Sequence, residues 1–250
     1  MQASPHWNAR RTVTLMTLEE TMNLLASKGT EQTKKTYRRH GAPEPFFGVK
    51  IGDMKPIVKL IKGDQELAMQ LYETGNSDAM YMAGLVADGR KMKRAQLERW
   101  VKNSVWHMHA SFTVPNVAAE HPDAIELALK WIDSPKELVA SAGWGTLSAV
   151  MCMRPDEELP IKQIQALLTR VVKTLKTTPN HVRCEMNNFV ICCGTYVAPL
   201  ADEAMEAAKK IGKVDVDMGD TACQVPDAAS YILKSRRGLP VAPKRKTTKC

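Results

Sequence analysis

A hairpin of two short helices, predicted between Asp64 and Asp88, constrains the fold more than any other stretch of the sequence. Leucine, alanine and tyrosine side chains recur there with helical spacing, and Gly75 begins a stop and cap signal between the two helices. The second helix runs from Asp78 to about Val86 and contains small residues that permit close packing. Because such a hairpin cannot bury its apolar face alone, we expect further helix pairs to stack on it.

Similar helical patterns follow one another along the rest of the chain. Thr17 and Glu20 form a predicted capping box at the start of one helix, and the stripe from Ile161 to Leu175 is strongly amphipathic. No alternating strand pattern is present, and the helix pairs recur at about forty residues, which is the period of HEAT-type repeats. The sequence therefore predicts an all-α, HEAT-like helical-repeat solenoid in which the second helix of each pair lines the concave side.

Three regions are predicted from these patterns. Residues 1–16 form a partly disordered N-terminal extension, residues 17–236 form the repeat domain, and residues 237–250 form a basic C-terminal tail. We expect the tail to act as a flexible electrostatic tether to a polyanion.

The composition favours a soluble protein of a reducing cytoplasm, and we expect it to be a monomer. The chain has 250 residues of which 44% are hydrophobic, enough to bury a core without disulfides. Its 6 cysteines show no metal-binding spacing, so we interpret them as ordinary thiols and expect neither a metal nor a cofactor. No apolar run reaches the length of a membrane span, and the N-terminus lacks the core of a signal peptide.

Positive charge is concentrated in particular stretches of the chain. The formal net charge is +8, and the residues from Lys234 to the C-terminus contain seven lysines and arginines but no acid. A second basic stretch lies between Lys28 and Lys62, whereas the hairpin at 64–88 contains acids and no base. This pattern is typical of a protein that holds a polyanion against certain faces, of which nucleic acid fits best. A solvated surface with a disordered tail is the alternative.

Several short motifs occur in an order that resembles the DNA alkylation repair proteins built of HEAT-like repeats. They are Tyr37-Arg38-Arg39-His40-Gly41, Phe47-Gly48-Val49, Leu71-Tyr72-Glu73, and Trp106 ahead of Val114-Pro115. The resemblance spans roughly residues 17 to 210. It implies the family's fold, duplex DNA as a partner, and for some members excision of alkylated purines.

The family's glycosylases use a tryptophan and a carboxylate four residues later, with an arginine in the next repeat. Trp106 matches the tryptophan, but the carboxylate position falls on Ala110, or on Ser111 with one gap, and the arginine position falls on Ser141. A cationic sugar needs a nearby anion, and an aromatic face holds a cationic base. Excision would therefore require another carboxylate near Trp106. The candidate catalytic residues are Trp106, Glu120 and Glu185.

Candidate DNA contacts come from the resemblance, from basic stretches and from polar residues in apolar helices. His107 and His109 lack a third metal ligand, so we interpret them as groove residues that attract phosphate when protonated. Adjacent amides at 187 and 188 need partners, either in a neighbouring loop or on DNA. The candidate DNA contacts are Tyr37, Arg38, Arg39, Lys50, His107, His109, Ser141, Arg183, Asn187, Asn188, Lys244, Arg245 and Lys246.

Two functions remain open on this basis. One is a duplex DNA-binding protein that resembles alkylpurine DNA glycosylases and excises N3- or N7-alkylated purines. The other is a non-catalytic HEAT-repeat protein that binds DNA or serves as a protein-interaction scaffold. The nucleic-acid hypothesis rests on a positively charged hollow with Trp106 at its middle.

Overall fold

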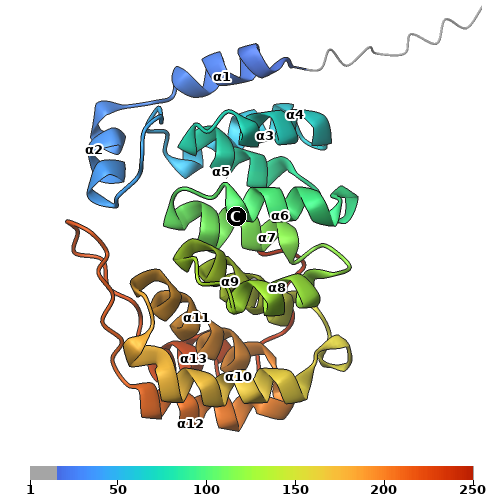
Figure 1. The fold of residues 1–250 in the computed structure, drawn as a ribbon, viewed down its shortest axis with the longest axis vertical. Coiled ribbons are helices and arrows are strands. Elements are labelled where there is room, and N and C mark those ends of the chain that lie inside the picture. Colours follow the sequence, from blue (N-terminus) through green and yellow to red (C-terminus); the bar gives the residue numbers. More distant parts are fainter. Residues whose placement is uncertain (1–15, 250) are drawn as a thin grey trace, which may run out of the picture.

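The computed structural model describes residues 16–249, and the regular elements within that range are all helical. The helices stack in chain order from α1 at the top of Figure 1 to α12 at the bottom, which confirms the predicted all-α class. Most of the predicted N-terminal extension lies outside the described residues. The α-helices are α1 Leu18–Ala26, α2 Glu31–Arg39, α3 Ile51–Leu60, α4 Gln65–Glu73, α5 Ser77–Val86, α6 Arg94–Lys102, α7 Val114–Ala118, α8 Ala124–Ile132, α9 Glu137–Met153, α10 Ile161–Thr174, α11 Asn180–Tyr196, α12 Ala201–Ile211 and α13 Ala228–Arg236.

Shorter helical turns connect several of these helices. They are η1 Gly89–Lys91, η2 His109–Thr113, η3 Asp156–Glu158, η4 Leu175–Thr177 and η5 Ala198–Leu200. The element η2 is a π-helical turn, and the other four are 3₁₀ turns.

Local signals set several helix starts. The capping box at α1 is present: the Glu20 N–H donates to the Thr17 hydroxyl at 3.2 Å, and the Thr17 N–H donates to the Glu20 carboxylate at 2.8 Å. The α4–α5 hairpin also forms as predicted, with the Asn76 side chain accepting from the first N–H groups of α5. Helix α3 begins at Ile51 and follows Lys50, which makes no side-chain cap hydrogen bond.

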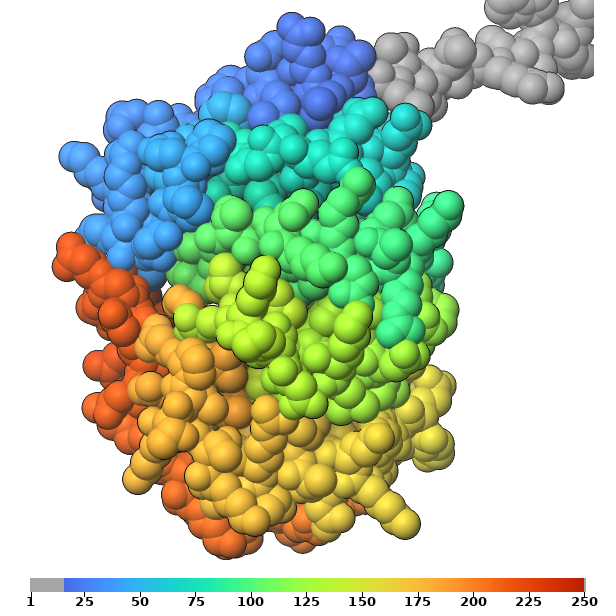
Figure 2. All heavy atoms as spheres, viewed as in Figure 1, coloured from blue at the N-terminus to red at the C-terminus, as the bar shows by residue number. Residues whose placement is uncertain are grey.

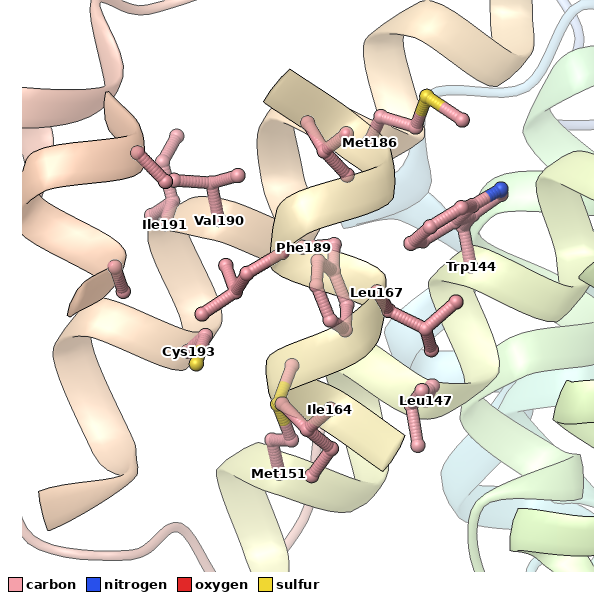
Figure 3. Packing of buried hydrophobic residues seen from close by; sticks show 14 of the residues in the cluster. Trp144, Leu147, Met151, Ile164, Leu167, Met186, Phe189, Val190, Ile191 and Cys193 are labelled. Carbon is pink, nitrogen blue, oxygen red and sulfur yellow. The ribbon is translucent and has the colours of Figure 1, made fainter. Parts of the chain in front are cut away.

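The paired helices have different environments. The first helix of a pair, such as α10, buries one stripe that contains Ile164 and Val171 and exposes the opposite face. The second helix is enclosed: α9 contacts α7, α8 and α11, and is buried without a break from Ala140 to Cys152. Trp144 is fully buried in this layer, where its ring packs edge-on against Phe189 with centroids 5.0 Å apart (Figure 3). Trp144 is therefore a core residue.

The C-terminal segment, residues 237–249, packs along the C-terminal ends of the inner helices. The Ala242 N–H donates to the Thr195 carbonyl at 2.7 Å, and the Arg245 N–H donates to the Cys152 carbonyl at 2.7 Å. The Lys244 ammonium donates to the Met151 carbonyl at 2.9 Å. The prediction of a flexible tether is wrong, because the chain lies against helix ends whose dipoles attract cations.

A loop between α12 and α13, residues 212–227, crosses from the last repeats to α2 and is called the arch below. Figure 1 shows it at the left of the molecule, and Figure 2 shows its orange atoms against the blue N-terminal region. Arg39 holds the tip of the arch by two hydrogen bonds. The Asp220 N–H donates to the Arg39 carbonyl at 3.0 Å, and the Arg39 Nε donates to the Asp220 carbonyl at 2.5 Å. The arch therefore joins the two ends of the helical stack.

Within residues 16–249, the helices are too short or too polar to cross a membrane.

Candidate functional site

A cavity of about 520 Å³ lies between α2, the turn before α7, α11 and the tip of the arch. It brings together five of the predicted site residues, which are Tyr37, Trp106, His107, Glu185 and Asn188. These residues come from distant parts of the sequence, and only the stacking of the repeats places them around one space. The cavity is therefore the candidate functional site.

Trp106 forms one wall of the cavity. The residue is 6% exposed, and its Nε1 donates to the His40 carbonyl at 2.9 Å, which fixes the ring orientation. The Tyr37 ring lies beside it with centroids 5.2 Å apart, and the Tyr37 hydroxyl donates to the Val49 carbonyl at 2.5 Å. A hydrogen bond thus fixes the orientation of each ring, and both side chains line the cavity.

Asp78 holds the segment against which Tyr37 is anchored. Its buried carboxylate accepts the N–H groups of Phe47, Gly48 and Val49 at 2.6, 2.9 and 3.0 Å. Burial raises the pKa of Asp78, and these hydrogen bonds oppose that rise. The carboxylate of α5 thereby positions the aromatic wall on α2.

The π-helical turn η2 directs two further side chains toward the cavity. The Val114 N–H donates to the His109 carbonyl, a five-residue span that inserts one extra residue into the helix. Ser111 and Phe112 from this turn line the cavity, and Phe112 is 42% exposed. Sequence periodicity is ambiguous over this region because the extra residue shifts the helical phase.

Glu185 supplies the cavity with a carboxyl group on α11. The residue is 4% exposed, and burial raises the pKa of its carboxyl group to about 7, while hydrogen bonds from Ser111 and Asn188 oppose the rise. The Asn188 Nδ2 lies 3.4 Å from the Glu185 Oε1. Near neutral pH the carboxyl group is thus divided between its protonated and ionised forms.

The two predicted histidines have different positions. His107 lines the cavity and stacks on His181 with centroids 4.9 Å apart, whereas His109 is fully buried with its Nε2 3.1 Å from the Ser77 carbonyl. The pKa of each is lowered to about 4, chiefly by burial, and for His107 the neighbouring His181 contributes to that lowering. Both rings therefore stay neutral between about pH 6.5 and pH 4, which weighs against the predicted attraction of phosphate over that range.

Metal-binding side chains do not gather at this site. Across residues 16–249, no three or more histidine, cysteine, aspartate or glutamate side chains form a group that could hold a metal ion. The described cysteines are free thiols, and Cys152 and Cys192 have their sulfur atoms 3.6 Å apart.

Glu120, Ser141 and Asn187 are among the predicted residues that lie away from the cavity. Glu120 accepts from the Gly89 N–H and pairs with the Lys249 ammonium, each at 2.9 Å, so it is not the carboxylate near Trp106. Ser141 and Asn187 are fully buried in the inner helices, and the Asn187 Nδ2 donates to the Pro226 carbonyl at the end of the arch. The predicted DNA contacts of Ser141 and Asn187 are therefore excluded by burial.

Other predicted DNA contacts hold parts of the chain together. Arg39 binds the tip of the arch, and Arg183 donates to the Asp215 carbonyl of the arch at 2.7 Å. Lys244 pairs with Asp156 at 2.7 Å in addition to its bond to a helix end. The remaining predicted contacts are exposed on the surface. They are Arg38, Lys50, Arg245 and Lys246.

The charge of the cavity differs from the predicted positive hollow. Among the described residues, neither lysine nor arginine lines it, and its acidic members are Glu185 and Asp217. The positive charge lies instead on the surface of residues 28–62, where eight of the nine basic residues are exposed. The prediction of a basic hollow is wrong, so the charge of the cavity gives no support to DNA binding. The lysines and arginines of residues 28–62 lie on the surface and not in the cavity lining.

Sequence reasoning missed three contributors to the site. His181 and Phe112 carry no recognisable motif, and Met218 enters the cavity from a loop that is distant in sequence. The sequence signal in this loop was the glycine at position 219, and the structure gives it a φ of +76°, which suits glycine. A glycine indicates a turn but does not indicate which distant residues the turn contacts.

Stacked helix pairs with an aromatic cavity on their inner side define a helical-repeat protein of the HEAT-like type. The chain belongs to the DNA alkylation repair enzyme family, whose sequence profile matches residues 21–213. It is 38% identical to the uncharacterized protein Lmo0209 of Listeria monocytogenes and 37% identical to Lin0241 of Listeria innocua. Each alignment covers 89% of this chain and 98% of the relative.

A solved structure shares the whole architecture. It matches with a TM-score of 0.84 and 36% sequence identity, and the match covers 94% of this chain and 100% of that one. That structure is described as one of "a new family of proteins related to the HEAT-like repeat DNA glycosylases with affinity for branched DNA structures". The predicted family and the HEAT-like fold are thus confirmed.

Proposed function

We propose that the protein binds DNA without sequence preference and binds branched DNA more tightly than linear duplex. The observation that carries this proposal is the end-to-end likeness to a structure whose family has affinity for branched DNA. The likeness includes the repeats that build the cavity, because it covers 94% of this chain.

A set of unpaired lysines supports binding to the DNA backbone. In the described part of the chain, several exposed lysines between residues 28 and 62 make no ion pair, in contrast to Lys34, Arg38 and Arg39. Lysines of this kind attract phosphates without reading bases. The unpaired lysines are Lys28, Lys35, Lys50, Lys55, Lys59 and Lys62.

Fluorescence anisotropy tests the proposal with a four-way junction, a three-way junction and a linear duplex of equal length. We expect tighter binding to both junctions at every salt concentration, and an affinity for each DNA that falls with added salt. The double variant Lys55→Glu and Lys59→Glu should weaken binding to all three DNAs. The matched double variant Lys162→Glu and Lys173→Glu, on the exposed face of α10, should not.

Equal affinity for junction and duplex would contradict the branched-DNA preference. Salt-independent binding, or no binding, would favour the alternative of a protein-interaction scaffold.

Excision of alkylated purines is the second candidate function. One observation favours it: Glu185 and Trp106 line the same cavity, so a carboxylate and an aromatic face are available together. The ionised form of Glu185 would have to stabilise the cationic sugar. Release of 7-methylguanine or 3-methyladenine from methylated DNA, lost in Glu185→Gln, would establish this activity, and no release above background would exclude it.

A further inference from the structure

The cavity offers ring faces suited to a planar ligand. Trp106 and Tyr37 contribute anchored rings to the lining, and Phe112, a residue that is 42% exposed, contributes a third ring. Every nucleobase has a π face that stacks on such side chains, with little dependence on which base it is. The volume of about 520 Å³ lies in the range of small-molecule sites.

The same cavity offers hydrogen-bonding groups for the edge of a base. The Glu185 carboxyl, the Asn188 carboxamide and the Ser111 hydroxyl all line it. Together these groups provide both donors and acceptors, as an unpaired Watson–Crick edge requires. A purely apolar ligand would offer the buried Glu185 carboxyl group no hydrogen bond in place of those that it loses to water.

The charges of the cavity disfavour a phosphate inside it. Glu185 and Asp217 line it, and the guanidinium groups of Arg39 and Arg183 donate to backbone carbonyls of the arch. A phosphate needs cations, so it would remain outside, whereas an uncharged base can enter. The arrangement separates a base site from a backbone site.

The arch closes one side of the cavity with Met218 and Gly219. Asn180 and Asp217 bond reciprocally at 2.7 Å: the Asn180 Nδ2 donates to the Asp217 carbonyl, and the Asp217 N–H donates to the Asn180 Oδ1. A base paired within a stacked duplex cannot enter a space bounded in this way, because it must first leave the stack.

We infer that the cavity binds one unpaired nucleobase at a branch point of DNA, with the arch held over it and the phosphates outside. This inference rests on the proposed DNA binding and names the part of branched DNA that the protein recognises. A junction exposes unstacked bases, and a linear duplex does not. This difference would explain why the protein binds branched DNA more tightly than linear duplex.

The first test compares two three-way junctions that differ at one unpaired branch-point nucleotide. One junction carries a base there and the other an abasic tetrahydrofuran residue, with the same backbone charge. By anisotropy, we expect the abasic junction to bind about five-fold or more weakly, as expected from the loss of one stacked base. Phe112→Ala should reduce that difference to less than about two-fold. Tyr231→Ala, a change of an aromatic residue that is 44% exposed on α13, should leave it unchanged.

The second test concerns the arch. Asn180→Ala removes the reciprocal bonds to Asp217 without a change in charge, and should also reduce the preference for the base over the abasic residue. Asn116→Ala, a matched change on α7, should retain the preference.

Equal binding of the base and abasic junctions by the unsubstituted protein would overturn the inference. If both junctions nevertheless bind more tightly than the linear duplex, the proposed preference for branched DNA remains supported. Equal binding of junction and duplex would instead refute the proposed function itself, so the two failures are distinguishable.

Discussion

Replacing Glu185 by glutamine should stabilise the folded protein, and should do so more at pH 8 than at pH 5. Burial raises the pKa of this carboxyl group from 4.5 to about 7, so the folded state favours the protonated form. The group's contribution to stability is therefore complete below about pH 4.5 and is lost as the pH rises through 7. Glutamine has a similar shape and carries no charge at either pH.

The size of the effect follows from the same pKa. Each pKa unit corresponds to about 1.4 kcal/mol, so ionised Glu185 lowers the free energy of unfolding by about 3 kcal/mol at alkaline pH. At pH 5 the carboxyl group is protonated in the folded protein, and only part of this loss has developed. The stabilisation by Glu185→Gln should therefore be larger at pH 8 than at pH 5 by about 2 kcal/mol.

Urea denaturation of both proteins at pH 5 and pH 8 measures this difference. The buried histidines titrate in both proteins, so their effects cancel in the comparison between variant and parent. Glu157→Gln, a change at an exposed carboxyl in η3, serves as the control and should show no pH-dependent stabilisation. If Glu185→Gln behaves like this control, the carboxyl group is not buried in the cavity, and the reasoning about the site is wrong.

Three further predictions follow from the same contacts. Gly219→Ala should release the arch, because the residue has a φ of +76° and a methyl group there would overlap the Arg39 carbonyl. Faster hydrogen exchange at residues 214–221 would show this release. Deletion of residues 238–250 should lower the melting temperature, since Lys249 bonds the Ala87 carbonyl and pairs with Glu120; an unchanged melting temperature would argue for a loose tail. The folded protein favours the neutral form of the buried His109 ring, whose pKa is about 4, so the free energy of unfolding should fall as the pH falls from 6.5 to 4. His109→Gln should reduce that fall, and chemical denaturation across this pH range would measure it.

Local signals predicted much of the fold. The capping box of Thr17 and Glu20, the α4–α5 hairpin and the stripe of α10 all depend on residues within one or two turns, and all three formed as expected. The extra residue of η2 could not be predicted, because a π-helical turn breaks the periodicity on which the prediction depends.

The site was harder to predict because it depends on contacts between distant residues. Tyr37, Trp106 and Glu185 were predicted as candidate site residues, and the structure places them around one cavity. The stack of His107 on His181 joins residues that share no local pattern, so periodicity could not have predicted it.

Two predictions that were based on charge were wrong. The basic tail was interpreted as a free tether, yet Lys244 and Lys249 bind helix ends within the chain. The hollow was expected to be basic, yet Arg39 and Arg183 hold the arch. A charged side chain in a sequence shows that a partner is needed but not whether that partner is DNA or the protein itself.

Photo-crosslinking tests the central claim most directly. A three-way junction with 4-thiothymine as the unpaired branch-point base would be irradiated in complex with the protein, and the crosslinked peptides identified by mass spectrometry. The account predicts crosslinks to the segments 106–112 and 184–188, which line the cavity. Crosslinks confined to the outer helices α4, α8, α10 and α12 would contradict it.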